Sequence, residues 1–254
     1  MEFGAQLYTV RDFTQNEEDF KSTLKRIAEI GYKNIQISAV GPIAPEIIKS
    51  IADYYGLKIV VTHYDVNKIQ NDTKAVIEHH KKLGCENIGI GYFPFNGESS
   101  YYQFIKDFEK PMKMMKENGM KLHYHNHSFE FERFGQRTGY DILIEETDKD
   151  LFGFILDTYW VQVGGKNPSD LIERLKGRIS CMHIKDMSIQ NGNQCIAEIM
   201  EGNLDFDKIL TSCKNSGVQY ALVEQDGNWR VDPFTSLETS YKNIKKKKWE
   251  EKNG

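Results

Sequence analysis

Short runs of apolar residues alternate with longer amphipathic runs along the whole chain. In the short runs, apolar residues are nearly continuous or alternate with polar ones, which is typical of strands in a buried parallel sheet. Eight such runs are predicted to be strands: Phe3–Thr9, Asn34–Ala39, Lys58–Tyr64, Asn87–Tyr92, Lys121–His127, Phe152–Trp160, Ile179–Lys185 and Tyr220–Gln225.

The longer runs carry apolar residues three or four positions apart, so that these residues share one face of a helix. In the first of them, Phe20, Leu24 and Ile27 form such a stripe. The predicted helices are Asn16–Ile30, Pro45–Tyr55, Asp72–Leu83, Tyr101–Asn118, Tyr140–Thr147, Pro168–Leu175, Asp205–Ser216 and Pro233–Lys245. Glycine follows most of them, because it enters the left-handed conformation that ends a helix without steric cost.

Eight strands alternating with helices predict an α/β fold, the (β/α)8 or TIM barrel, which typically takes about 250 residues. The chain of 254 residues is therefore expected to be a single domain spanning residues 1–254. An open doubly wound sheet is the alternative. The first strand–helix turn lacks the GxGxxG pattern and no GxxxxGK[ST] loop is present, so the simplest nucleotide-binding motifs are absent from the sequence.

Polar residues gather at the carboxyl ends of the predicted strands, whereas the amino-terminal halves are mostly apolar. In a TIM barrel the carboxyl ends of the strands form the active-site face. The residues expected to bind substrate at this face are Gln6, Tyr8, His63, His125, Asn126 and Trp160.

Four residues at or just beyond the last strand ends are predicted to bind one divalent metal ion: Glu130, Asp157, His183 and Glu224. Three carboxylates and one imidazole suit Mn²⁺, Mg²⁺ or Co²⁺ better than they suit a structural zinc ion, because structural zinc prefers thiolates. Mn²⁺ is the expected ion, with Mg²⁺, Co²⁺ and Zn²⁺ as alternatives. Because Glu130 lies past its strand, His123 or His125 is an alternative ligand; His123 lies deeper and is expected to be a hydrogen-bonded core residue.

Lys185 follows His183 by two residues, so both side chains are expected to point into the barrel. Two roles remain open for Lys185. It stabilises an oxyanion or binds a substrate hydroxyl, or it forms a structural ion pair with Asp186 or Glu224.

Composition and charge narrow the choice of partners. The formal net charge of −4 disfavours a nucleic-acid binder, because such proteins concentrate positive charge. The basic run Lys245–Lys248 is expected to be a solvated helix end, and His79 and His80 are expected at the surface. No apolar run approaches the ~18 residues needed to span a bilayer, and the four cysteines lack CxxC spacing.

We therefore expect a cytoplasmic protein with reduced thiols, a small molecule as its partner, and no membrane or nucleic-acid partner. The alternative is export from the cytoplasm by a signal peptide that is then removed. Homo-oligomerisation also stays open, because Tyr101, Tyr102 and Phe104 suit a dimer face as well as a core.

Six segments of the chain resemble the sugar phosphate isomerase/epimerase proteins of the xylose-isomerase-like barrel superfamily. They are Phe3–Arg11, Tyr124–Phe131, Leu156–Val163, Met182–Met187, Gly202–Phe206 and Val223–Asp226, and the likeness runs nearly end to end. The resemblance implies a divalent-metal site at the barrel mouth formed by the four ligands predicted above. In some epimerases of this superfamily the first and last carboxylates also act as acid–base groups, which implies catalytic roles for Glu130 and Glu224.

A subset with the His-Asn-His-Ser-Phe-Glu segment is similar to proteins acting on 3-keto sugars and glycosides, in which a histidine beside the ligands is the base. His127 matches that histidine. Two positions depart from the wider pattern. His123 stands where many relatives have a strand-five Glu, and Gln36 stands where many have Glu at the end of strand two, which puts an acid–base or sugar-binding role there in doubt.

Three functions follow as hypotheses. The first is a metal-dependent isomerase or epimerase of a monosaccharide or keto-sugar derivative, in which His127 removes a carbon-bound proton to form an enediolate and Lys185 stabilises charge. The second is a dehydratase or 3-keto-glycoside lyase that uses the same metal and base. The third is a non-catalytic sugar-binding barrel, which only the Gln36 exchange suggests.

Overall fold

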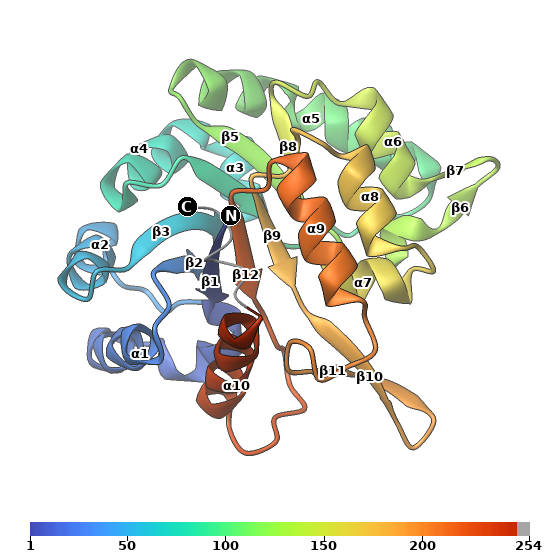
Figure 1. Cartoon of the computed structure of the whole chain (residues 1–254). Helices are drawn as coiled ribbons and strands as arrows, with labels where there is room; N and C mark the ends of the chain where they lie inside the picture. The colour runs from blue at the N-terminus through green and yellow to red at the C-terminus, as the bar shows by residue number, and fades with distance from the viewer. Residues whose placement is uncertain (248–254) are drawn as a thin grey trace.

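The structure is a computed structural model that describes residues 1–247. Eight parallel strands form a nearly closed barrel surrounded by helices, as Figure 1 shows. They are β1 (Glu2–Gln6), β2 (Asn34–Ile37), β3 (Lys58–His63), β4 (Asn87–Ile90), β5 (Lys121–His125), β8 (Phe152–Ile155), β9 (Cys181–Ile184) and β12 (Tyr220–Val223). The predicted single-domain TIM barrel is confirmed.

The strands are ordered β8-β5-β4-β3-β2-β1-β12-β9, so the two ends of this sheet are β8 and β9. The barrel closes between them through single contacts instead of a continuous ladder. His183 N donates to Leu156 O at 2.9 Å, Phe154 N donates to Arg178 O at 2.9 Å, and Asp157 forms a parallel bridge with His183. The point of closure therefore brings together two of the residues predicted to bind metal.

Ten α-helices lie among the described residues: α1 (Glu17–Ile30), α2 (Pro45–Tyr54), α3 (Val66–Asn71), α4 (Thr73–Leu83), α5 (Glu98–Glu117), α6 (Gly139–Glu146), α7 (Thr158–Val163), α8 (Pro168–Arg174), α9 (Phe206–Ser216) and α10 (Pro233–Lys246). The short helices α3 and α7 are additional to the eight predicted. Gly31, Gly84 and Gly217 end α1, α4 and α9 in the left-handed conformation, as the sequence indicated.

Every barrel strand ends earlier than predicted, by one residue in β9 and by five in β8. In β1 and β8 the reason is local hydrogen bonding by polar side chains. Gln6 Oε1 accepts from Tyr8 N at 2.6 Å and starts a 3₁₀ helix, Leu7–Phe13. Asp157 Oδ1 accepts from Trp160 N at 3.0 Å and caps α7, so Trp160 lies in a helix and not at a strand end.

Alternation along the strands sends one set of side chains outward to the helices and the other into the barrel. In β5 Leu122 and Tyr124 belong to the large core between sheet and helices, which leaves His123 and His125 inside the barrel. A second, small apolar cluster that includes Ile155, Cys181 and Leu222 fills the barrel below the polar residues. The barrel interior is therefore apolar in the middle and polar at its carboxyl end.

Two small hairpins extend this scaffold, β6 (Arg133–Phe134) with β7 (Arg137–Thr138) and β10 (Asp186–Gln190) with β11 (Asn193–Ala197). Figure 1 shows β10 and β11 extending away from the barrel. In the basic run, Lys245 and Lys246 end α10, whereas Lys248 lies outside the described residues. Among residues 1–247, none of the helices combines the length and the apolar character that crossing a bilayer requires.

Candidate metal centre and active site

Four buried side chains meet where β5, β8, β9 and β12 end: His125, Asp157, His183 and Glu224. The four candidate ligand atoms, one from each, lie within 4.8 Å of one another. The structure therefore brings together three of the four residues predicted to bind metal, and it adds His125, which the sequence left open as a ligand.

Both histidines present an unprotonated ring nitrogen to this cluster. His183 Nε2 lies 2.7 Å from Gln36 Oε1, and because an amide oxygen only accepts, Nε2 carries the proton and Nδ1 does not. His125 Nδ1 donates to the backbone oxygen of Gly91 at 3.1 Å, which leaves its Nε2 as an acceptor. Metal-ligating histidines are typically oriented in this way, by donating their other ring N–H to an oxygen.

The distances fit a single divalent ion. His183 Nδ1 and Glu224 Oε2 lie 2.9 Å apart with facing lone pairs, and within residues 1–247 neither atom makes a well-formed hydrogen bond. His125 Nε2 and His183 Nδ1 lie 3.4 Å and 3.8 Å from Asp157 Oδ2. Two ligands about 2.1 Å from one ion lie roughly 3.0–3.4 Å apart at angles of 90–110°. A cation at the centre would lie between these acceptors and give His183 Nδ1, which has no hydrogen-bond partner among residues 1–247, a ligand contact.

The charges of the cluster keep the carboxylates ionised. Burial opposes the ionisation of Glu224, but the neighbouring His183 and Lys185 outweigh it and hold the pKa of this carboxyl well below its usual range. Burial also opposes the ionisation of Asp157, and Lys185 outweighs it and lowers its pKa. Burial opposes a charge on His125, but the hydrogen bond and charge of Asp157 raise its pKa. A metal ion would therefore compete with a proton for His125 Nε2, and its binding should weaken as the pH falls.

Lys185 is fully enclosed beside this cluster, with 1% of its surface exposed. Its Nζ lies 2.8 Å from Glu224 Oε2, 3.1 Å from Asp157 Oδ2 and 2.9 Å from Asp226 Oδ2. Burial alone would lower the pKa of Lys185, but Asp157 and Glu224 outweigh burial and raise it well above its usual value. Of the two partners expected from the sequence, the ion pair with Glu224 is present.

The other expected partner, Asp186, has a different role. Its carboxylate accepts hydrogen bonds from the backbone N–H groups of Met187, Met200, Gly202 and Leu204, at 2.7–3.2 Å. Asp186 therefore holds the turn that follows the β10–β11 hairpin and does not pair with Lys185.

The structure corrects the placement of Glu130. Its carboxylate is fully buried but accepts from Tyr124 Oη at 2.6 Å and from His127 N at 2.9 Å. Tyr124 faces outward from β5, and Glu130 lies in a 3₁₀ turn, Phe129–Phe131, beyond that strand. The side chain thus fixes the backbone of the segment that carries His127, and His125 takes the place in the cluster that the sequence assigned to Glu130.

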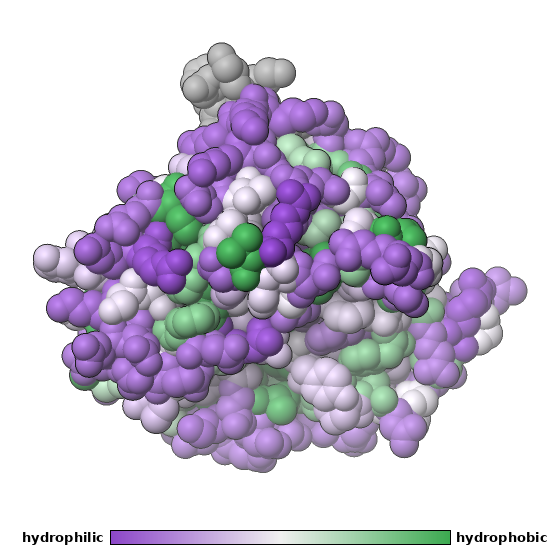
Figure 2. All heavy atoms as spheres, turned by 90° about the horizontal axis from the view of Figure 1, so that it is seen from below, coloured by the Kyte–Doolittle hydropathy of each residue, from purple (hydrophilic) through white to green (hydrophobic). Residues whose placement is uncertain are grey.

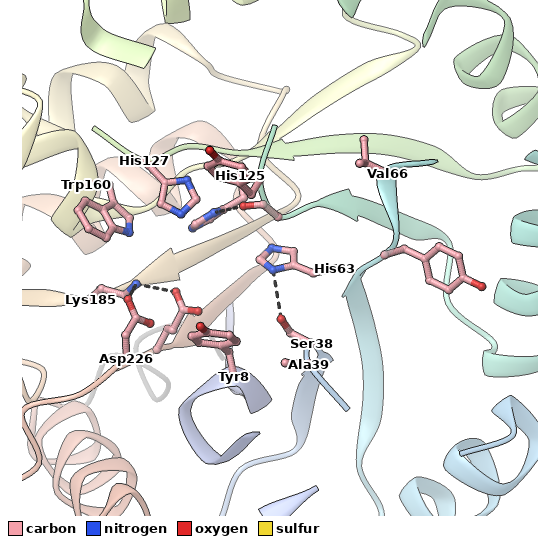
Figure 3. Close-up of a pocket in the computed structure, with 14 residues that line it drawn as sticks. Tyr8, Ser38, Ala39, His63, Val66, His125, His127, Trp160, Lys185 and Asp226 are labelled. Carbon is pink, nitrogen blue, oxygen red and sulfur yellow. Dashed lines mark hydrogen bonds and ion pairs between the residues drawn. The ribbon is translucent and has the colours of Figure 1, made fainter. Parts of the chain in front are cut away.

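A cavity of about 480 Å³ opens above the cluster. Its polar lining includes His63, His125, His127, Lys185, Glu224 and Asp226, and its apolar wall includes Tyr8, Tyr64, Val66, Tyr92 and Trp160. Figure 3 shows most of these side chains converging from different strands and loops. The volume falls within the range of roughly 300–1,000 Å³ that is usual for small-molecule sites.

His127 stands just beyond β5, and its ring lines this cavity. Its Nδ1 is buried and has no hydrogen-bond partner among the described residues. The ring stacks on Phe129 with centroids 5.5 Å apart and lies 5.4 Å from the Trp160 ring. Burial lowers the pKa of His127 to about 3, so the ring is neutral at physiological pH.

His63 occupies the opposite side of His125, as Figure 3 shows. Its Nδ1 lies 3.2 Å from Ser38 Oγ, and its Nε2 has no partner within the part of the chain that the structure describes. Burial, then the nearby His125, keeps the pKa of His63 well below its usual value. The cavity therefore presents two neutral imidazoles, one on each side of the metal cluster.

Two residues expected to bind substrate lie behind the cavity wall instead, which corrects their predicted role. Gln6 is fully buried and donates from Nε2 to Glu224 Oε1 at 2.7 Å. Asn126 is also fully buried; its Oδ1 accepts from Asp157 N at 3.1 Å and its Nδ2 donates to His127 O at 3.3 Å. Both amides position residues of the site and do not face the cavity. Tyr8, His63, His125 and Trp160 do line it.

Sequence reasoning missed Asp226 and Ser38 as residues of the site. Asp226 follows Glu224 by two positions, which is the same signal that placed Lys185 with His183 and would have sufficed to find it. Burial, then the charge of Glu224, raises the pKa of Asp226 to about 6. Ser38 lies just beyond β2, and nothing in its local sequence distinguishes it.

The chain is similar in sequence to known proteins. Residues 24–242 match the sequence profile of the family described as xylose isomerase-like TIM barrel. An inosose dehydratase of Clostridium beijerinckii is 21% identical over 277 aligned positions, covering 91% of this chain and 90% of the relative. An inosose dehydratase of Geobacillus kaustophilus is 22% identical over 189 positions, covering 65% of this chain but only 61% of the relative's own length.

The fold also has close counterparts among solved structures. A Parabacteroides distasonis protein described as a sugar phosphate isomerase/epimerase superposes with a TM-score of 0.81 at 24% identity, covering 96% of this chain and 93% of the other. At this level of identity the likeness establishes the fold.

Proposed function

The chain belongs to the xylose isomerase-like TIM-barrel family, and from the centre at its barrel mouth we propose that it is a divalent-metal-dependent dehydratase of a cyclic polyhydroxy ketone. The observation that carries this proposal is the buried cluster of His125, Asp157, His183 and Glu224 beneath a cavity lined by the His127 ring, whose Nδ1 has no hydrogen-bond partner among the described residues. The names of the relatives support the outcome, since both are inosose dehydratases, and an inosose is a ring ketone that carries hydroxyl groups.

The four cluster residues would hold the ion, which is expected to be Mn²⁺, with Mg²⁺, Co²⁺ or Zn²⁺ as alternatives. Two imidazoles and two carboxylates are donors that suit a transition-metal dication. When bound, such an ion polarises a ketone oxygen and makes the neighbouring C–H group more acidic. The rest of the chemistry depends on side chains that this chain supplies.

His127 is the proposed general base. Its neutral ring lines the cavity, and its buried Nδ1 has no hydrogen-bond partner among residues 1–247. The stacked Phe129 and the Glu130 bond to its backbone keep the ring in place. It accepts the proton from the carbon next to the ketone and returns it to the hydroxyl group on the following carbon. That hydroxyl group departs as water, and a C=C bond forms between the two carbons. One proton is taken and one is returned, so the elimination is balanced.

Lys185 supports the same step electrostatically. Its ammonium lies at the cavity wall, 5.7 Å from the centre of the Trp160 ring, and a fixed positive charge stabilises the negative charge that develops on the substrate oxygen. Glu224 belongs to the cluster that would hold the ion, so the role we assign to it is that of a ligand in place of its predicted catalytic role. Glu130 acts through the backbone of His127 and has no access to the cavity.

The isomerase or epimerase outcome expected from the sequence remains the second candidate, because it shares the first proton transfer. One observation favours it: His63 offers a second neutral imidazole on the other side of His125. An epimerase that returns the proton to the opposite face of the carbon needs such a second group. A 3-keto-glycoside lyase would expel an alcohol in place of water by the same elimination.

The proposal is tested with protein stripped of metal by EDTA and reloaded with Mn²⁺. Inosose, ketoses and 3-keto glycosides are incubated with it in D₂O, and NMR follows deuterium entry beside the ketone and the products. We expect Mn²⁺-dependent exchange and loss of water, both abolished in His127→Ala. The matched control is His123→Gln, which should retain activity. His123 lies deeper in the barrel, in β5, and is bonded to Asn87 Oδ1 at 3.0 Å.

Absence of exchange and of product with every compound and metal would refute the catalytic proposal and favour a non-catalytic sugar-binding barrel. Exchange that leads to an epimer or isomer without loss of water would replace the dehydratase by the second candidate.

A further inference from the structure

Lys185 lines the cavity together with two residues of the metal cluster, His125 and Glu224. Its Nζ contacts Glu224 Oε2 at 2.8 Å and Asp157 Oδ2 at 3.1 Å. The same two oxygens are the ones nearest the unprotonated ring nitrogens, at 2.9 Å from His183 Nδ1 and 3.4 Å from His125 Nε2. A divalent ion in the cluster and the ammonium of Lys185 therefore depend on the same two carboxylate oxygens.

A divalent ion and an ammonium repel each other strongly when both lie in a buried site, because little water screens them. Lys185 can respond to this repulsion, since its charge sits at the end of a flexible chain of four methylene groups. The direction in which it can move is set by its third partner. Asp226 Oδ2 lies 2.9 Å from Nζ on the cavity side.

Asp226 is suited to accept this charge. Its side chain is 28% exposed, compared with 4% for Glu224 and 0% for Asp157, so it lies farthest toward the cavity. Its Oδ1 has no hydrogen-bond partner within residues 1–247. The backbone of Asp226 is held in place from outside the cluster by Arg11, whose Nη2 donates to its carbonyl oxygen at 3.3 Å.

Lys185 alone does not neutralise the negative charge of the site. Three ionised carboxylates and one ammonium, with both ligand histidines neutral, leave a net charge of −2 on the group formed by Asp157, Glu224, Asp226 and Lys185. A divalent cation completes the balance only if Lys185 stays and keeps Asp226 as its counter-ion. Asp226 thus neutralises the charge of Lys185 without being a ligand of the ion.

We propose that Lys185 is the internal counter-ion of the metal centre in the metal-free protein, and that Asp226 is the positioning residue that takes up its ammonium when a divalent ion binds. This inference rests on the metal site of the proposed function, but not on the reaction. Binding of the ion moves the ammonium toward the cavity, where it faces the substrate oxygen. The positive charge used in catalysis is therefore put in place by the metal itself.

The test measures metal binding and thermal stability, so it does not need a known substrate. Mn²⁺ affinity is determined by calorimetry on EDTA-stripped protein, and melting temperatures are recorded in EDTA and in excess Mn²⁺. The variants are Lys185→Met, whose unbranched side chain is one atom shorter and carries no charge, and Asp226→Asn. The control is Lys121→Met, a partly buried lysine at the start of β5 whose Nζ donates to Lys149 O at 2.6 Å.

Lys185→Met should melt several degrees below the wild type in EDTA, because the buried carboxylates lose their counter-ion. In excess Mn²⁺ this difference should vanish or reverse, and Mn²⁺ should bind at least about tenfold more tightly. Asp226→Asn should melt near the wild type in EDTA but bind Mn²⁺ about three- to tenfold more weakly, since Lys185 loses the partner to which it moves. Lys121→Met should change the melting temperature equally in both conditions.

Mn²⁺ binding that is unchanged or weaker in Lys185→Met, or a melting deficit of the same size with and without Mn²⁺, would overturn the proposal. If Lys185→Met does not fold, Asp226→Asn decides alone, and wild-type affinity in that variant would overturn it. A wild-type protein that binds Mn²⁺ but transforms no ketone would refute the proposed reaction and leave this exchange of partners standing.

Discussion

Asp157 uses its two carboxylate oxygens for two separate tasks, and a single substitution can separate them. Oδ1 accepts from Trp160 N at 3.0 Å and caps α7, while Oδ2 lies 3.4 Å from His125 Nε2 in the metal cluster. Asparagine caps a helix about as well as aspartate. Asp157→Asn should therefore preserve the cap and remove the charged ligand, whereas Asp157→Ala should remove both.

The magnitudes follow from the contacts that each variant loses. In Asp157→Asn, Lys185 still has two carboxylate partners, so the free energy of unfolding in EDTA should fall by only about 1 kcal/mol. Asp157→Ala should lose a further ~1–2 kcal/mol for the missing cap, which lowers the melting temperature by roughly another 2–8 °C for a chain of this size. Both variants should lose more than about 100-fold in Mn²⁺ affinity, since even outer-shell changes cost 10–100-fold.

Calorimetry with Mn²⁺ and thermal unfolding in EDTA measure the two effects independently. The matched control is Asp205→Asn, because Asp205 caps α9 by accepting from Lys208 N at 3.0 Å and lies outside the cluster; this variant should change neither quantity appreciably. Wild-type Mn²⁺ affinity in Asp157→Asn would refute the ligand role. A melting temperature as low as that of Asp157→Ala would refute the separation of the two oxygens.

Three further predictions concern the surroundings of the site. Burial lowers the pKa of His80 to about 4 from an ordinary value near 6.5, so the unfolded chain binds this proton more readily and stability falls as the pH drops. The loss between pH 7.5 and 5 should be about 2 kcal/mol from this group; urea unfolding at both pH values should show a smaller loss in His80→Gln, and an equal loss would contradict the assignment. Gln36→Glu should place a carboxylate against His183 Nε2 and tighten Mn²⁺ binding by about tenfold. It should also lower the melting temperature in EDTA, because an extra buried charge is costly without the ion; unchanged Mn²⁺ affinity by calorimetry would argue against the contact. Gly91→Ala would bring a methyl group to 2.7 Å from His63 Nδ1, so the ring must move. The move should cost about 1–3 kcal/mol of stability and reduce Mn²⁺-dependent turnover; wild-type turnover and stability would show that the ring is not confined there.

The barrel could be predicted because its signal is repeated along the chain. Each strand has a buried apolar pattern and each helix an apolar stripe, and these patterns reflect backbone geometry that tertiary contacts do not change. The position of the site followed from the same regularity. His183 in β9 and Asp157 and Glu224 just beyond β8 and β12 point inward by alternation, and the structure places them together.

Errors arose where local hydrogen bonds or tertiary packing determine a position. Trp160 was predicted at a strand end, but the cap formed by Asp157 turns the chain into α7. Glu130 was predicted in the cluster, but its carboxylate bonds to Tyr124 and faces away from it. The surface position predicted for His80 is wrong, because His80 is fully buried and bonds to Thr62 Oγ1 and to the backbone oxygen of Val76. None of these partners can be read from the spacing of residues alone.

The location of a bound ion is the most direct test of the account. Crystals grown with MnCl₂ should give one strong anomalous manganese peak between His125, Asp157, His183 and Glu224, with Lys185 Nζ turned toward Asp226. A site without a peak, or a peak ligated by Glu130 in place of His125, would contradict the central claim that these four side chains form the metal centre.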